Sequence, residues 1–267
     1  MIRRAAVAGL FYAGGTTALR HEVEDLLATG VEQVEGAGVV VPHAGYLYSG
    51  GVAGAVYARV NPPDVCVILG PNHAGLGAGA AVVTAGTWET PLGEATIDTE
   101  LARAILDRSR VLEEDARAHQ KEHSIEVQLP FLQVRFPQVP FVPICLYSHE
   151  YGVCQDVGRA MAEAIQASGK RVLLIASTDM SHYISRELAE RKDRMAIDAM
   201  VNLDPERLHQ TVLRERISMC GFHPATAILI AAKALGASRA ELIRYATSGD
   251  VTKDYTSVVG YAGLIIQ

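Results

Sequence analysis

Residues 39–73 contain two short apolar runs, each followed by a histidine: residues 39–41 precede His43, and residues 65–69 precede His73. Both runs are rich in β-branched residues and are closed by glycine or proline, which is typical of buried strands. The small and apolar residues between the runs predict a helix packed on a sheet, and hence a strand–helix–strand unit with parallel strands. Ligands of open α/β sheets gather outside the carboxyl ends of the strands, so both histidines are candidate metal ligands.

A third apolar run, residues 171–177, is followed by Asp179 and His182. One histidine at the end of a strand is more often structural than functional. Three strand ends that each deliver titratable groups in one α/β chain favour the functional interpretation. We therefore expect His182 to take part in the chemistry, with Asp179 close to it in the same turn.

Residues 122–132 combine Glu122, His123 and Glu126 with apolar residues at helical spacing. In a helix the two glutamates share a face, where like charges four residues apart repel each other. A cation, a protonated partner or solvent is then expected to compensate them. The alternative interpretation is a capped helix on the surface.

Cys220 is followed by Gly221 and His223, just ahead of an apolar helix predicted over residues 225–235. The amino terminus of a helix stabilises a thiolate, so we expect a lowered pKa for this thiol. Cys220 is therefore the cysteine best suited to metal ligation or redox chemistry. The alternative is a buried, inert thiol.

Composition excludes several classes of protein. The 267 residues carry a formal net charge of −6 and no basic cluster longer than Arg3-Arg4, so a small soluble ligand is a better expectation than nucleic acid. The apolar part of the first residues is too short for a secretory signal or for the ~20 residues of a membrane span, which predicts a cytoplasmic protein without a membrane partner. No linker divides the chain, so a single domain over residues 1–267 is expected.

Taken together and in order, these motifs resemble the signature of the Memo family over nearly the whole chain. The motifs are Pro-His43-Ala-Gly-Tyr, Gly-Pro-Asn-His73, Glu122-His123-Ser-Ile-Glu, Ser-Thr-Asp179-Met-Ser-His182 and Cys220-Gly-Phe-His223-Pro. The family is similar in fold to the class III extradiol (LigB-type) dioxygenases. The resemblance implies an α/β fold with three layers, in which helices lie on both faces of a mixed, mostly parallel sheet.

The resemblance also implies a ligand set. His43 and His73 would bind the metal, and Cys220 would be the third ligand, at the position where the dioxygenases have a carboxylate. A thiolate shifts the preference of such a site from iron(II) toward copper or zinc. Iron(II) is the first expectation, copper the second, and zinc the third.

Catalytic roles follow from the same resemblance. His182 would act as the acid/base, and His123 would line the pocket and hydrogen-bond a substrate oxygen. Among the acids, Glu122, Asp179 and Asp250 are candidates for ligation or for orienting the second ring nitrogen of a histidine, and Asp179 is the first choice.

Three functions remain open at this point. The first is a dioxygenase-like redox enzyme that uses O₂ on a small substrate, such as an aromatic diol. The second is a catalytically vestigial, metal-binding scaffold, because bacterial and archaeal Memo proteins resemble protein B of the AmmeMemoRadiSam system, which implies radical-SAM and AMMECR-like partners. The third is zinc-dependent hydrolysis, which the lack of an H-E-x-x-H helix disfavours.

Overall fold

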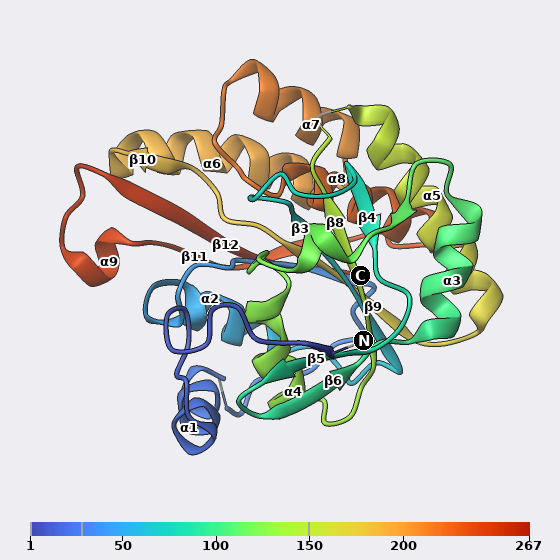
Figure 1. The fold of residues 1–267 in the computed structure, drawn as a ribbon. Helices are drawn as coiled ribbons and strands as arrows, with labels where there is room; N and C mark the ends of the chain where they lie inside the picture. The colour runs from blue at the N-terminus through green and yellow to red at the C-terminus, as the bar shows by residue number, and fades with distance from the viewer. Residues whose placement is uncertain (1, 28, 149) are drawn as a thin grey trace.

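The computed structural model describes residues 2–27, 29–148 and 150–267. A mixed sheet forms the centre of the molecule, and helices cover both of its faces (Figure 1). Its middle consists of parallel strands in the order β2 (Gly38–Val41), β9 (Val172–Ser177), β3 (Val65–Pro71) and β8 (Phe141–Leu146). Every residue of β2, β3 and β8 is buried, which explains their uninterrupted apolar sequences, because such strands are covered on both faces.

The predicted strand–helix–strand unit is confirmed, with one addition. Helix α2 (Tyr46–Tyr57) connects β2 to β3, and the two strands are parallel. They are not neighbours, because β9 lies between them: Ile175 is paired with Val39 on one side and with Ile68 on the other. The carboxyl ends of three adjacent strands therefore meet at the same edge of the sheet.

Antiparallel pairs lie toward both lateral edges of the main sheet, as expected for a mixed sheet. On one side β12 (Val258–Ile266) is antiparallel to β2, to β11 (Ala240–Thr247) and to the short β10 (His182–Ile184). On the other side β4 (Ala80–Val82) is antiparallel to β8, and β7 (Glu113–Glu114) runs parallel to β4.

The helices form the two outer layers (Figure 1). One layer contains α2 with α1 (Thr16–Leu26) and α4 (Leu129–Arg135). The opposite layer contains α3 (Thr99–Arg108), α5 (Tyr151–Ser168), α6 (Arg186–Val201), α7 (Pro205–Arg214) and α8 (Phe222–Ala234). Helix α8 packs on the central strands and is covered by α5, so it is apolar on nearly all sides.

A smaller sheet lies beside the main one. Strand β1 (Ile2–Arg3) pairs with β5 (Thr87–Thr90), which forms a hairpin with β6 (Gly93–Thr96). The remaining short helices are η1 (Ala116–His119), η2 (Glu126–Gln128) and α9 (Gly249–Thr252). Among the residues that the structure describes, no helix is both long enough and apolar enough to cross a membrane.

Candidate metal centre

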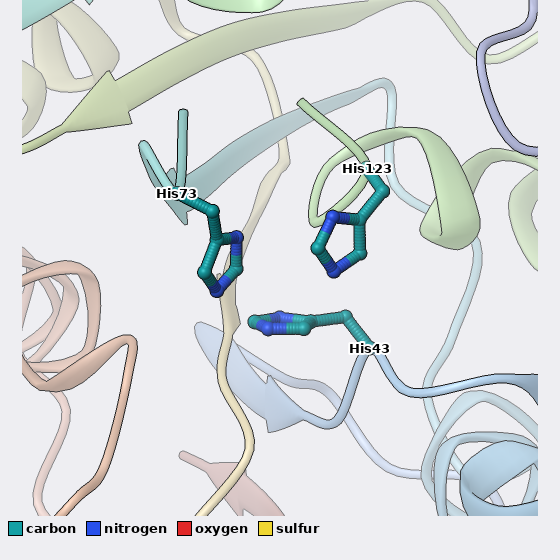
Figure 2. Close-up of side chains that lie close together, drawn as sticks. All are labelled: His43, His73 and His123. Carbon is teal, nitrogen blue, oxygen red and sulfur yellow. The ribbon is translucent and has the colours of Figure 1, made fainter. Parts of the chain in front are cut away.

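The carboxyl ends of β2, β9 and β3 deliver His43, Asp179 and His73, each two residues beyond the end of its strand. Because the three strands are adjacent, these side chains gather at one edge of the sheet, where the sequence predicted a site. His123 reaches the same place from the segment that precedes η2. Figure 2 shows the rings of His43, His73 and His123 pointing toward one another.

One ring nitrogen from each of these three histidines lies within 4.8 Å of those of the other two. The ring of His123 stacks on that of His73, with centroids 4.7 Å apart, and meets the ring of His43 edge-on. Imidazole nitrogens are donors that zinc, copper and iron ions all accept. The structure therefore contains a possible metal-binding group of three histidines.

Hydrogen bonds orient the two strand-end histidines. The hydroxyl of Ser177 donates to the carbonyl of Ser124 at 2.6 Å, so it must accept at 3.0 Å from Nδ1–H of His43. Likewise Nδ1 of His73 donates to Glu122 at 2.9 Å. In both rings Nε2 is left with its lone pair toward the cluster, which is the arrangement of metal-binding histidines with a hydrogen-bonded second nitrogen.

Burial and neighbouring histidines favour the neutral form of His43. Burial lowers its pKa well below the usual value, and the neighbouring rings of His123 and His73 lower it further. A neutral imidazole is the form that binds a metal ion. Burial likewise lowers the pKa of His123, although the nearby Glu122 carboxylate opposes the effect.

The helix predicted over residues 122–132 is wrong at its start. Regular structure begins only at Glu126, because the carboxylate of Glu122 folds back and accepts hydrogen bonds from the backbone N–H of Ser124 and of His73. This segment packs closely on β3, where a Cβ on Gly70 would clash with the hydroxyl of Ser124. The two glutamates consequently do not share a helix face.

Of the two glutamates, Glu126 has the cationic partner that was expected. Arg3 pairs with Glu126 at 2.6 Å, and Tyr12 donates a hydrogen bond to the same carboxylate. Glu122 is paired with His73. Burial opposes ionisation of Glu122, but the hydrogen bonds from His73 and Ser124 outweigh it and lower the pKa of Glu122 to about 2.

Cys220 also reaches the cluster, although the group of three histidines does not include it. Its Sγ lies 3.2 Å from Nε2 of His43 and accepts a hydrogen bond at 3.2 Å from the backbone N–H of Asp179. Gly221, the N-cap of α8, allows this close approach, because a Cβ there would clash with the carbonyl of Ser177.

The expectation of a lowered pKa for Cys220 is wrong. Burial raises the pKa of this thiol, and the nearby Asp179 carboxylate raises it further. The hydrogen bonds from Asp179 N–H and from Thr178 act in the opposite direction but do not outweigh burial. Ligation by Cys220 therefore requires that the metal ion displace the thiol proton.

The first choice among the acids also needs correction. Asp179 does not orient a histidine ring: its carboxylate accepts a hydrogen bond at 2.8 Å from the backbone N–H of His43, and burial raises its pKa to about 6. The acid that orients a ring is Glu122. Asp250 is held elsewhere, by Arg186 and by the backbone of Thr247.

His182 lies at the start of β10, where it is partly exposed. Its Nδ1 is 2.8 Å from the carbonyl oxygen of Ser218 and must donate to it, so Nε2 is left as the acceptor and potential base. His182 is close enough to His43 and Asp179 to influence the pKa values of both.

Three contributors were not found from the sequence. Ser177 anchors His43, Gln128 donates hydrogen bonds to Ser177 and to the carbonyl of Pro42, and the ring of Phe11 packs on His123 at 4.6 Å. The only available signal was at Ser177, a polar residue that ends an apolar strand. Phe11 comes from an N-terminal segment whose sequence predicts no chemistry.

Comparisons with known proteins agree with this description. A family model described as Memo-like protein matches residues 3–265. A MEMO1 family protein of Methanopyrus kandleri is 43% identical over 281 residues, covering 100% of this chain and 99% of that protein. A MEMO1 family protein of Methanothermobacter thermautotrophicus is 42% identical over 276 residues, covering 99% of this chain and 100% of that protein.

The fold has a counterpart among solved structures. The crystal structure of an uncharacterized protein from Escherichia coli K12 matches with a TM-score of 0.56 and 15% identity, covering 85% of this chain and 98% of that one. The mixed sheet flanked by helices is consistent with the extradiol dioxygenase-like fold. The family model and the relatives cover almost the entire sequence, and the chain belongs to the Memo family.

Proposed function

We propose that the protein is a dioxygenase-like redox enzyme that uses non-haem iron, or alternatively copper, and O₂ on a small diol substrate, with aromatic diols as the first class to test. The observation that carries this proposal is the convergence of His43, His73 and His123, whose ring nitrogens lie within 4.8 Å of one another at the carboxyl edge of the sheet. A bound iron or copper ion would supply the redox chemistry that amino-acid side chains lack.

In this proposal His43 and His73 hold the metal through Nε2, because their Nδ1 atoms are committed to Ser177 and Glu122. Cys220 is the proposed third ligand, supported by its Sγ 3.2 Å from Nε2 of His43. His123 is the competing third donor, supported by its place in the histidine group. The two choices predict different metal preferences, since thiolate favours copper or zinc over iron(II).

The remaining groups would handle substrate and protons. Nε2 of His182 would accept a proton from a substrate hydroxyl, because its Nδ1–H is fixed by the carbonyl of Ser218. Asp179 would hold the backbone of His43 in place. Phe11 packs on His123 and would exclude water from that side of the histidine cluster.

The deciding experiment is an anaerobic titration of metal-free protein with Fe(II), Cu(I) and Zn(II). We expect stoichiometric binding of Fe(II) or Cu(I) that His43→Ala abolishes. Cys220→Ser and His123→Ala, measured side by side, identify the third ligand as the one whose loss weakens binding more. Metal binding that is unchanged in all three variants, His43→Ala, Cys220→Ser and His123→Ala, would refute the site.

The catalytic part of the proposal needs a separate measurement. O₂ uptake with a panel of catechols is expected in the metal-loaded protein and is expected to disappear in His182→Ala while metal binding stays unchanged. Loss of metal together with activity would refute the role of His182 as acid/base. Preferential Zn(II) binding without O₂ uptake would instead favour hydrolysis.

A further inference from the structure

His182 makes two hydrogen bonds to a single residue, Ser218. The backbone N–H of His182 donates to Oγ of Ser218 at 2.7 Å, and its ring donates from Nδ1 to the carbonyl oxygen of the same residue at 2.8 Å. The hydrogen bond made by one ring nitrogen decides which of the two nitrogens carries the proton. The position of Ser218 relative to His182 therefore determines whether Nε2 is free to accept a proton.

Neither residue lies in a long element that could fix this position. His182 begins the three-residue strand β10, whose pairing with β12 is irregular between His182 and Ile184. Ser218 lies in residues 215–221, which connect α7 to α8 without helix or strand. The two segments therefore depend on contacts with other parts of the fold.

Helix α6, which packs against β10 and α7, makes the first of these contacts (Figure 1). Its Asp193 is fully buried, and Oδ1 accepts a hydrogen bond at 3.0 Å from the backbone N–H of Ser181. The second oxygen, Oδ2, accepts at 2.7 Å from the hydroxyl of Tyr245 on β11. Because both oxygens are bound, the carboxylate is fixed in one orientation and ties the turn before His182 to α6.

Strand β12 holds the same turn through backbone hydrogen bonds. The N–H of Met180 donates to the carbonyl of Gly260 at 2.8 Å, and the N–H of Gly260 donates to the carbonyl of Ser181 at 2.9 Å. A Cβ at Gly260 would clash with Oδ2 of Asp193. The lack of a side chain at this position therefore allows Asp193 to lie against β12.

Lys192, the preceding residue of α6, holds the other segment. Its ammonium group donates to the carbonyl oxygens of Glu215 and Arg216, at 2.8 and 3.1 Å. Glu215 is the C-cap of α7, and carbonyl groups at the end of a helix lack partners within it and attract a cation. Lys192 therefore ties to α6 the stretch of chain that leads to Ser218.

We propose that Asp193 and Lys192 are positioning residues for His182. Adjacent on one helix, they set the distance between the turn that carries His182 and the segment that carries Ser218. The ring of His182 is thereby kept as the Nδ1–H tautomer, with Nε2 available as the base. The inference rests on the proposed function for the role of His182 in turnover, but the tautomer is measured without metal or substrate.

The first experiment reads the tautomer by ring-nitrogen NMR of metal-free protein with isotope-labelled histidine, at a pH above the range in which imidazoles titrate. The spectrum of His182→Ala assigns the signals. We expect the Nδ1–H tautomer of His182 to dominate in the unmodified protein, and its share to fall at least ~2-fold in Lys192→Met, which keeps the apolar stem but has no donor.

Two further variants control for this substitution. Lys192→Arg should restore the tautomer, because a guanidinium has donors for both carbonyl oxygens. Arg191→Met, which removes the neighbouring exposed cation of α6, should leave the tautomer unchanged. An unchanged tautomer in Lys192→Met, or an equal change in Arg191→Met, would overturn the role of Lys192.

Asp193 is tested in the same way. Asp193→Ala removes both acceptors and should lower the share of the Nδ1–H tautomer, whereas Asp193→Asn keeps an oxygen for the N–H of Ser181 and should retain it. If Asp193→Ala does not fold, Tyr245→Phe decides the question, because it frees one carboxylate oxygen and should change the tautomer in the same direction by less. An unchanged tautomer in the deciding variant would overturn the role of Asp193.

O₂ uptake separates this inference from the proposed function. In metal-loaded Lys192→Met we expect kcat to fall about 10-fold with unchanged metal affinity, a part of the ~10²–10⁴-fold that a positioned acid/base contributes. If the unmodified protein takes up no O₂ with any catechol, the proposed function fails, whereas the NMR result still decides how His182 is held. A changed tautomer with unchanged kcat would overturn the link between this positioning and turnover.

Discussion

The metal centre has two halves that are built differently. The sheet half consists of His43 and His73, which follow buried parallel strands and are each fixed by one hydrogen bond at Nδ1. The loop half consists of His123, Cys220 and His182, which lie outside the parallel strands: His123 and Cys220 are in irregular segments, and His182 begins the short antiparallel strand β10.

The loop half depends on contacts between segments that are distant in sequence. His123 belongs to the short segment between Glu122 and Glu126, and each glutamate binds a different part of the chain. Glu122 ties the segment to His73, and Glu126 ties it to the N-terminal residues that bring Phe11 onto His123. Buried carboxylates therefore hold the segment of His123 in place, whereas backbone pairing between strands holds the residues that precede His43 and His73.

The largest expected effect comes from removing the buried carboxylate of the loop half. Glu126→Ala leaves the guanidinium of Arg3, whose side chain is 9% exposed, without its partner and also deprives Tyr12 of its acceptor. We expect a loss of about 3–5 kcal/mol in the free energy of unfolding, measured by urea denaturation. The control is Glu163→Ala, which removes one of the two acidic partners of Arg159, in a pair whose side chains are 44% and 47% exposed, and should cost at most ~0.5 kcal/mol. Equal losses would show that Glu126 is not an anchor.

The second effect concerns the link between the halves. Glu122→Gln preserves the size of the side chain but replaces the carboxylate that accepts from Nδ1 of His73 and from the backbone of Ser124. We expect metal affinity to fall about 10–100-fold, the usual result of losing the group that orients a metal-binding histidine. The control is Glu113→Gln, a substitution at an exposed position. This variant should bind metal like the unmodified protein. Unchanged affinity in Glu122→Gln would mean that His73 is not a ligand.

The difference between the halves also explains what the sequence could predict. Apolar periodicity reports burial between layers, so β2, β3, β8 and β9 and the histidines that follow them were predictable. The fold of the segment from Glu122 to Glu126 was not, because carboxylate bonds to distant backbone groups replace the helix that local spacing favours. For the same reason the thiol of Cys220 was misjudged: its pKa depends on burial beside Asp179, which no local pattern contains.

Within the sheet half, a smaller effect is expected from Ser177→Ala. The hydroxyl accepts hydrogen bonds from His43 and Gln128, and its loss leaves two buried donors without an acceptor. We expect the free energy of unfolding to fall by about 1–3 kcal/mol and metal binding to weaken, because the tautomer of His43 is no longer fixed. Ser257→Ala, at an exposed position, should change neither quantity. A stability loss with unchanged metal affinity would separate the hydroxyl from the metal centre.

In the loop half, Phe11→Ala tests the packing on His123. An aromatic pair contributes about 0.5–1.5 kcal/mol beyond the burial of area, so we expect a loss of that order in stability and a modest drop in metal affinity if His123 is a ligand. The neighbouring Leu10 is 81% exposed, and Leu10→Ala should have no effect on either quantity. If Leu10→Ala changed the metal affinity as much as Phe11→Ala, the effect would come from the N-terminal segment as a whole and not from the ring of Phe11.

The smallest expected effect has the opposite sign and is found beside His182. Tyr183 has a φ of 57°, a left-handed conformation that costs most residues ~1–2 kcal/mol, and it occupies the irregular step in the pairing of β10 with β12. Its side chain is 78% exposed, so little packing is lost on replacement. Tyr183→Asn, which tolerates this conformation, should raise stability by ~0.5–1 kcal/mol and the Tm by a few degrees. Tyr183→Ala lacks the short polar side chain with which asparagine hydrogen-bonds the local backbone in this conformation, so it should not raise the Tm. Equal Tm values for the two variants would show that the left-handed backbone at Tyr183 stores no strain that asparagine can relieve.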